Sequence, residues 1–205
     1  MIAGYTTSFF IRFITFHRIK KSGGQDKIQI IRKVLYRENH MLIIDLMIEI
    51  RTLGEMPSLA PILAYWAYGE WYRNRPFDFY TVLKAYQSRA AGSDASRILI
   101  ALVDTLPAGM VSLRERDLVS RPDLSPWLSS LYVAPDMRCR GIGTALIENL
   151  CERSKTLGYA RLFLFLNLGH TVTLKNFYMK RGWSFSGVAP DNDGNDTDIM
   201  QKQLT

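Results

Sequence analysis

The order of strand-like and helix-like segments after Met41 constrains the fold of this chain more than any other feature. Apolar runs typical of strands occupy residues 41–53, 97–103, 108–116, 127–135, 160–167, 183–189 and 197–204, and apolar residues at helical spacing occupy 55–76, 77–91, 142–157 and 172–182. A helix between the fourth and fifth strands requires a crossover, so this pair of strands should be parallel. The pattern predicts a mixed α/β fold around one central sheet.

The first 40 residues differ from the rest of the chain in charge. They carry eight Lys and Arg against two acidic residues, a net charge of +6, whereas residues 41–205 contribute only +1 of the total of +7. A nearly neutral body gives no reason to expect a nucleic-acid partner. We expect residues 1–40 to be a basic extension, upstream of a true start at Met41, and residues 41–205 to form the domain. A targeting or membrane-surface segment is the alternative for the extension.

The few cysteines and histidines limit the kinds of site that the chain can form. Cys139 and Cys151 are too few for a disulfide framework, and the three scattered histidines lack the spacing of a metal site. No apolar run reaches the roughly 18 residues that a membrane span needs. We therefore expect a cytoplasmic protein without a metal or a membrane span.

The segment Arg138–Thr144, with the sequence RCRGIGT, joins the fourth strand to the third helix. Glycine lets a ligand approach the main chain, and the free N–H groups at a helix N-terminus attract anions. This combination favours a phosphate group as the ligand, and an ordinary solvated turn is the alternative. A P-loop needs a lysine after its glycines, and a dinucleotide fingerprint needs a third glycine where Leu146 stands, so neither motif fits.

A third pattern does fit this turn. The sequence LYVAP at residues 131–135 precedes RCRGIG at 138–143, and the strand RLFLFLN and the segment NFYMKRGW follow farther along the chain. In this order and spacing, residues 48–204 resemble the GNAT (Gcn5-related N-acetyltransferase) superfamily. The resemblance implies a mixed, strongly twisted sheet of about six to seven strands with about four helices, in which the fourth and fifth strands splay apart.

The resemblance also implies that acetyl-coenzyme A is the co-substrate. Main-chain N–H groups of the turn would hold its pyrophosphate, and the fourth strand would lie beside its pantetheine arm. A main-chain N–H near Leu131 would point at the thioester carbonyl. The residues that this assigns to the coenzyme are Leu131, Tyr132, Val133, Arg138, Cys139, Arg140, Gly141, Ile142, Gly143 and Thr144. Glycine is common in the family where Cys139 stands, and a side chain there is compatible with binding if φ is negative.

Tyr178 matches the tyrosine that the family places near the coenzyme sulfur as a general acid, and a core aromatic is the alternative. The fourth strand carries serines at 129–130 where some relatives have a carboxylate. Asp117 and Asp123, together with Glu115, flank the preceding loop and are the nearest candidates for a general base acting through water. Ordinary solvated carboxylates are the alternative for all three.

The function that the resemblance implies is N-acetyl transfer, by direct attack, from acetyl-CoA to a primary amine of a small molecule or a protein. A CoA-binding regulatory module without turnover is the alternative, because the fourth strand has no carboxylate. Four aromatic residues either line the acceptor pocket or belong to the core: Trp66, Trp71, Tyr72 and Trp127. The expected partners are acetyl-CoA and an amine acceptor, with a homodimer left open.

Overall fold

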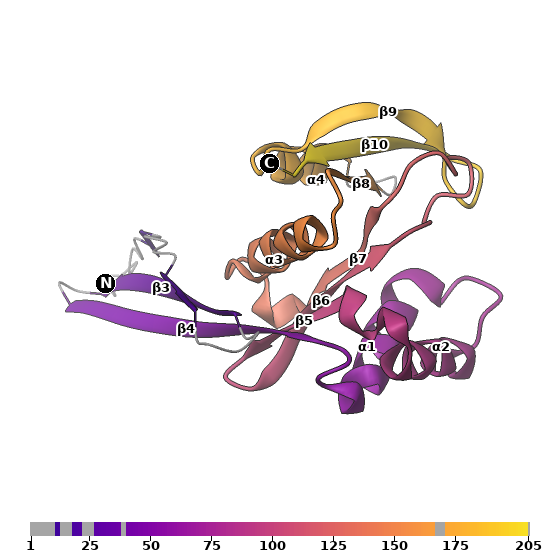
Figure 1. The fold of residues 1–205 in the computed structure, drawn as a ribbon. Coiled ribbons are helices and arrows are strands. Elements are labelled where there is room, and N and C mark those ends of the chain that lie inside the picture. Colours follow the sequence, from indigo (N-terminus) through magenta and orange to yellow (C-terminus); the bar gives the residue numbers. More distant parts are fainter. Residues whose placement is uncertain (1–10, 13–17, 22–26, 38–39, 167–170, 205) are drawn as a thin grey trace, which may run out of the picture.

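The structure is a computed structural model that describes residues 11–12, 18–21, 27–37, 40–166 and 171–204. In these residues ten strands form one sheet with the order β1-β3-β4-β5-β6-β7-β8-β10-β9, and β2 pairs with β3 (Figure 1). The strands are β1 Ile11–Arg12, β2 Arg18–Lys21, β3 Lys27–Arg37, β4 His40–Thr52, β5 Ile98–Val103, β6 Leu106–Arg114, β7 Trp127–Val133, β8 Arg161–Leu166, β9 Ser184–Pro190 and β10 Asp196–Gln203. The α-helices are α1 Ala60–Ala67, α2 Phe79–Ala91, α3 Ile142–Thr156 and α4 Thr171–Met179.

The predicted order of strands and helices after Met41 is confirmed. Each of the seven predicted strands corresponds to one of β4 to β10, and each predicted helix to one of α1 to α4, with ends that differ by a few residues. The largest difference is in the first helix, because α1 ends at Ala67 and the chain continues as a π-helix over Tyr68–Tyr72. Asp78 caps the next helix by accepting a hydrogen bond from the Thr81 N–H at 2.7 Å.

The sheet also continues into the basic extension, which the sequence pattern did not indicate. β3 pairs with β4 along its whole length, from Lys27 opposite Ile50 to Arg37 opposite His40. Only the last part of β4 also pairs with β5, so the β3–β4 hairpin projects away from the helices (Figure 1). The expected boundary at residue 40 falls at the first residue of β4, His40.

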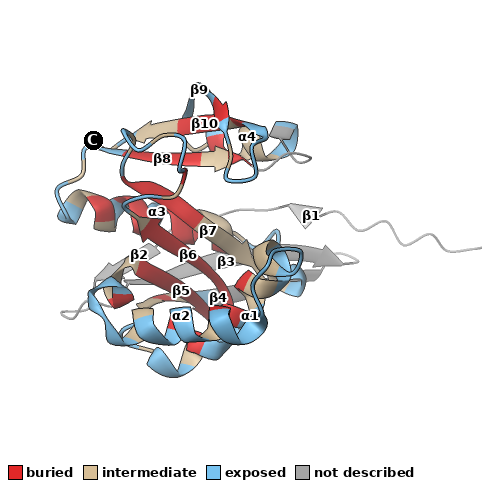
Figure 2. Ribbon diagram, turned by 90° about the vertical axis from the view of Figure 1, so that its right-hand side faces the viewer, coloured by how far each residue is buried: buried red, intermediate tan, exposed pale blue. Residues whose placement is uncertain are grey.

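Helices cover both faces of the central strands, which is why β5 is buried at every position. Leu99, Ala101 and Val103 pack on the side of α3, and the alternate residues of β5 pack on the side of α1 and α2. This is the period of two that a strand with two covered faces requires. Figure 2 shows the buried strands β5 and β6 between α3 and the α1–α2 pair.

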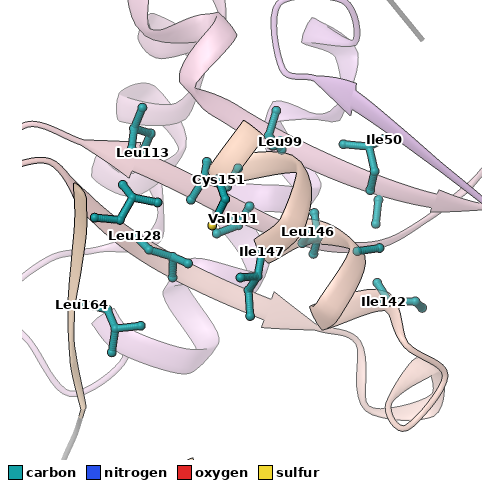
Figure 3. Close-up of a cluster of buried hydrophobic side chains, with 14 of the residues drawn as sticks. Ile50, Leu99, Val111, Leu113, Leu128, Ile142, Leu146, Ile147, Cys151 and Leu164 are labelled. Atoms are coloured by element: carbon teal, nitrogen blue, oxygen red, sulfur yellow. The ribbon is translucent and has the colours of Figure 1, made fainter. Parts of the chain in front are cut away.

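The larger core lies between α3 and the sheet (Figure 3). Ile142, Leu146 and Leu150 are each at most 1 % exposed, and Ile147 and Cys151 lie on the same buried side of the helix. Their spacing of three and four residues places them on one face. α3 is therefore held firmly against β5 and β6, and its N-terminus has a fixed position beside the end of β7.

Candidate functional site

Strand β7 is only partly paired with its two neighbours. On one side, the pairing with β6 changes register between Met110 and Ser112, and the bulged residue opposite, Ser130, has a φ of 54°. On the other side, β7 and β8 are parallel, and within the described residues they pair in register only at Trp127 and Phe163. The predicted splay of the fourth and fifth strands is confirmed. It opens an edge of β7 with which an extended, amide-containing ligand can pair.

The turn after β7 ends at the N-terminus of α3. Gly141 is the N-cap residue, and its φ of 82° lies in the left-handed region that glycine adopts without strain. The first main-chain bond of the helix runs from the Ala145 N–H to the Gly141 carbonyl at 3.0 Å. The amides of Ile142, Gly143 and Thr144 consequently have no partner within the helix, and they form the anion-attracting end that the sequence predicts.

The two arginines of the turn bind its own main chain. Arg138 donates from Nε to the Val133 carbonyl at 3.0 Å, and Arg140 donates from Nη2 to the Asp136 carbonyl at 2.9 Å. The Arg138 guanidinium also lies 5.9 Å from the centroid of the Tyr132 ring. A guanidinium has five N–H donors, so each arginine shapes the turn and retains donors for an anion.

Cys139 differs from expectation, because its φ is 59° rather than negative. A residue with a Cβ in this left-handed region carries strain of about 1–3 kcal/mol, which glycine would not. The thiol itself is exposed. The turn accommodates this cysteine at a cost in stability.

Helix α4 closes the other side of the turn. A Cβ on Gly143 would lie 3.7 Å from both Phe177 Cζ and Val133 Cγ2, so the glycine faces the packing between α3 and α4. Arg181 donates to Thr144 Oγ1 from Nε at 3.0 Å and from Nη2 at 2.6 Å. Arg181 was not singled out from the sequence. Its only indication there was a positive charge three residues after Tyr178, in the segment NFYMKRGW.

Tyr178 lies in the core on the α3 side of the sheet and is 6 % exposed. Its ring makes edge contacts with Phe177 and Trp183, at centroid distances of 5.2 and 5.7 Å. Burial raises the pKa of its hydroxyl, and the charge of Arg181 lowers it only in part. The hydroxyl thus keeps its proton at neutral pH and has no hydrogen-bond partner among the described residues. Both the acid role and the core role that the sequence left open are compatible with this environment.

Asp117 is the candidate base that the structure brings to β7. Its side chain is 11 % exposed, and its Oδ1 lies 3.2 Å from Nη1 of Arg114. Burial raises the pKa of this carboxyl group, while Arg114, the Ser129 hydroxyl and Arg89 lower it in part. The Ser129 hydroxyl is in turn 3.3 Å from that of Ser130, the bulged residue. A polar path therefore connects the Asp117 carboxyl group with the bulge.

The other two predicted carboxylates have different surroundings. The Asp123 side chain is 59 % exposed and receives two hydrogen bonds from Arg121, which lower the pKa of its carboxyl group. Glu115 accepts hydrogen bonds from Tyr159 and Arg97, and these lower its pKa. The structure does not bring Asp123 or Glu115 into contact with the bulge.

Two of the four predicted pocket aromatics lie beside β7. Trp66 stacks on Tyr132 at a centroid distance of 5.2 Å, and Trp71 makes an edge contact with the same ring at 6.4 Å. Trp127, in contrast, is fully buried, and its Nε1 donates to the Leu124 carbonyl, so it belongs to the core. The aromatic group around Tyr132 therefore lines the side of β7 that faces α1.

No cluster of three or more metal-binding side chains occurs in the part of the chain that the structure describes. Within the same residues, no helix combines the length and the apolar character that crossing a bilayer requires.

Comparison with known proteins relates this arrangement to one family. A model of the acetyltransferase (GNAT) family matches residues 61–183. Comparison with curated protein sequences gives no match.

Many solved structures share the fold. One assigned to the GNAT acetyltransferases, from Desulfovibrio desulfuricans, has a TM-score of 0.61 and 17 % identity over 77 % of this chain and 99 % of its own. An N-acetyltransferase from Staphylococcus aureus Mu50 has a TM-score of 0.58 and 18 % identity over 77 % of this chain and 99 % of its own. The PaiA N-acetyltransferase from Thermoplasma acidophilum, in complex with coenzyme A, has a TM-score of 0.53 and 20 % identity over 76 % of this chain and 98 % of its own. At these identities the likeness establishes the fold.

Proposed function

The chain belongs to the GNAT acetyltransferase family, and on this premise we propose that it transfers an acetyl group from acetyl-CoA to a primary amine. The observation that carries the proposal is the position of the open edge of β7 directly before the unpaired amides of α3. A peptide-like arm that ends in a pyrophosphate matches this combination, because its amides can pair with a strand and its phosphates with a helix N-terminus.

The residues of the turn fit the coenzyme. The amides of Ile142, Gly143 and Thr144 bind the pyrophosphate, with Arg138 and Arg140 adding positive charge. The edge of β7 at residues 131–133 binds the pantetheine arm. The coenzyme supplies an activated acetyl thioester at the bulge, the acceptor supplies the attacking amine, and the acid and base groups come from the chain.

In this proposal a proton donor and a proton acceptor act from opposite sides of β7. Tyr178 lies on the α3 side and, with its raised pKa, holds a proton that it can give to the departing thiolate. Asp117 lies on the α2 side, where the carboxylate accepts a proton from the attacking amine through Ser129 or a water molecule. General acid and base groups of this kind each contribute about 10²–10⁴ in rate. We assign no catalytic step to Asp123, because it is exposed and paired with Arg121.

The amine reaches the bulge from the side of α1 and α2. Trp66, Trp71 and Tyr132 lie on this side and provide ring faces that attract a cationic ammonium group before it loses its proton.

A thiol-release assay with acetyl-CoA and a panel of polyamines, amino acids, aminoglycosides and peptides tests the proposal. Transfer predicts acceptor-dependent release of free thiol, together with a mass increase of one acetyl group on the acceptor. Acetyl-CoA binding without thiol release for any class of amine would instead indicate a regulatory CoA-binding module. A protein that binds neither acetyl-CoA nor CoA would overturn the assignment of the turn.

A further inference from the structure

A pocket outside the proposed coenzyme site lies on the α2 side of the sheet, near the bulge. It has a volume of about 190 Å³ and is formed by the last turn of α2, the start of β5 and the end of β6. The charged residues that line it are four arginines, Arg89, Arg97, Arg114 and Arg116, and two acidic residues, Asp94 and Glu115. A water molecule occupies about 30 Å³ of liquid, so this space holds either a few waters or one small ionic group.

Ser112 contributes an unsatisfied hydroxyl to the wall of this pocket. The residue is 1 % exposed, and its Oγ has no hydrogen-bond partner among the residues that the structure describes. A buried polar group without a partner lowers stability, and native structures rarely keep one without a reason. An oxygen of a ligand in the pocket would satisfy this hydroxyl.

Two of the four arginines of the pocket are held by acidic residues. Arg97 is fixed by Glu115 and lies 3.8 Å from Asp94, and Arg114 is paired with Asp117. Tyr159 and Ser125 also donate to Glu115, so this wall is a connected network rather than a set of mobile side chains.

The other two arginines of the pocket are Arg89 and Arg116. Neither has a carboxylate within ion-pair distance among the described residues; Arg89 lies 5.7 Å from the ring centroid of Tyr86. The charge of Arg89 does act on Asp117, whose pKa it lowers, but Asp117 is already paired with Arg114. The pocket thus has an excess of positive charge, because its four arginines face only Asp94, Glu115 and Asp117 among the described residues. Guanidinium groups bind carboxylate and phosphate in a planar, two-bonded geometry.

The pocket adjoins the reaction site proposed above. Ser112 is the partner of Ser129 across the β6–β7 ladder, and the Ser129 hydroxyl lies 3.3 Å from that of Ser130 in the bulge. Arg114 follows Ser112 by two residues, which corresponds to roughly 7 Å along a strand. The arginines and the bulge are therefore close enough for one small molecule to span the distance between them.

We propose that this pocket binds an anionic group, a carboxylate or a phosphate, of the acceptor, so that the substrates are small amines that also carry an acid group. The inference rests on the proposed acetyl transfer at β7. The same anion chemistry also suits a free anion acting as an effector, and the experiment separates the two sources.

The experiment compares acceptors in matched pairs: an amino acid with its decarboxylated amine, and phosphoethanolamine with ethanolamine. Hydrogen bonds to charged groups contribute about 1.5–3 kcal/mol, so we expect kcat/KM to be at least about ten-fold higher for the acid-bearing member of each pair. Arg89→Met should remove most of this preference. Lys84→Met is the matched control, because it removes an equal charge from an exposed position on the same helix and should leave the preference intact.

Inorganic phosphate is the probe for the source of the anion. If the pocket holds the acceptor, phosphate inhibits competitively against the acid-bearing amine, and this inhibition weakens in Arg89→Met. Phosphate that activates, or that inhibits without competing, would show an effector site and overturn the proposal. Equal kcat/KM values within every matched pair would also overturn it while leaving acetyl transfer intact.

If no acceptor is acetylated, calorimetric titration of phosphate still shows whether the pocket binds an anion. Binding to the wild type that is lost in Arg89→Met and retained in Lys84→Met supports the pocket. Absence of binding to the wild type rejects it. Acetyl-CoA titrated separately shows whether the proposed function itself has failed.

Discussion

Gly109→Ala is a demanding test of the packing that positions β7. Gly109 lies in β6 opposite Val133, and a Cβ added to it would be 2.6 Å from the Tyr132 carbonyl oxygen and 3.2 Å from Leu146 Cδ1. A side chain can rotate away from such a contact, but a main-chain carbonyl in a sheet cannot. We expect the methyl group to push β7 outward at the residues that hold the coenzyme.

The magnitude follows from two opposing terms. Overpacking a core position costs about 1–3 kcal/mol, and replacing glycine by alanine returns about 0.4–1 kcal/mol by reducing the entropy of the unfolded chain. A net loss of about 1–2 kcal/mol remains. In a protein of this size each kcal/mol corresponds to about 2–4 °C, so Tm should fall by about 2–8 °C.

Thermal unfolding followed by circular dichroism measures the effect. Gly69→Ala is the control, because a Cβ on Gly69 would meet nothing within 4 Å and the residue lies in a helical segment. Its Tm should stay the same or rise slightly. A Gly109→Ala protein that melts at or above the wild-type temperature would refute the close approach of β6 and β7.

Three further predictions concern the chemistry and the domain boundary. Tyr178→Phe keeps the ring contacts and removes only the proton donor, so kcat should fall at least about ten-fold while Tm and acetyl-CoA affinity barely change; full kcat on a verified acceptor would remove Tyr178 from the mechanism. Because burial raises the pKa of Asp117, its basic carboxylate form is lost as the pH falls through a value above the ordinary one, near 4. The pH profile of kcat/KM should therefore show an acidic limb that Asp117→Asn abolishes, and an unchanged profile in that variant would contradict the assignment. A chain that begins at Met41 should bind acetyl-CoA with unchanged affinity, because β3 pairs with β4, on the far side of β5 and β6 from β7; its aggregation would show that the extension belongs to the core.

The sequence predicted the fold after Met41 because its signals are local. Apolar residues in α3 recur at three and four positions, and left-handed glycines at Gly158 and Gly182 follow α3 and α4. The strands of residues 1–40 were not predicted. Their basic composition favours an extension, and pairing with β4 depends on main-chain hydrogen bonds, which leave little trace in composition.

The candidate site was only partly predictable for the same reason. The turn at residues 138–144 is contiguous, so its motif can be read directly. Arg181 contacts Thr144, which is 37 positions away in the sequence. Ser112 and the arginines of the pocket beside α2 come together only when β5, β6 and α2 pack against one another. Asp117 and Asp123 looked equivalent in sequence, and only the folded chain separates them, because Asp117 is buried beside Ser129 whereas Asp123 is exposed and paired with Arg121.

Calorimetric titration of acetyl-CoA into the folded Gly143→Glu variant tests the central claim, that the turn before α3 holds the coenzyme. The site of a Cβ at Gly143 lies 3.7 Å from Phe177 Cζ and Val133 Cγ2, so Gly143→Ala fits and is the control. Glutamate adds bulk and a negative charge beside the amides that bind pyrophosphate. We predict that the wild type and Gly143→Ala bind acetyl-CoA, whereas Gly143→Glu does not. Near-normal affinity in Gly143→Glu would contradict the account.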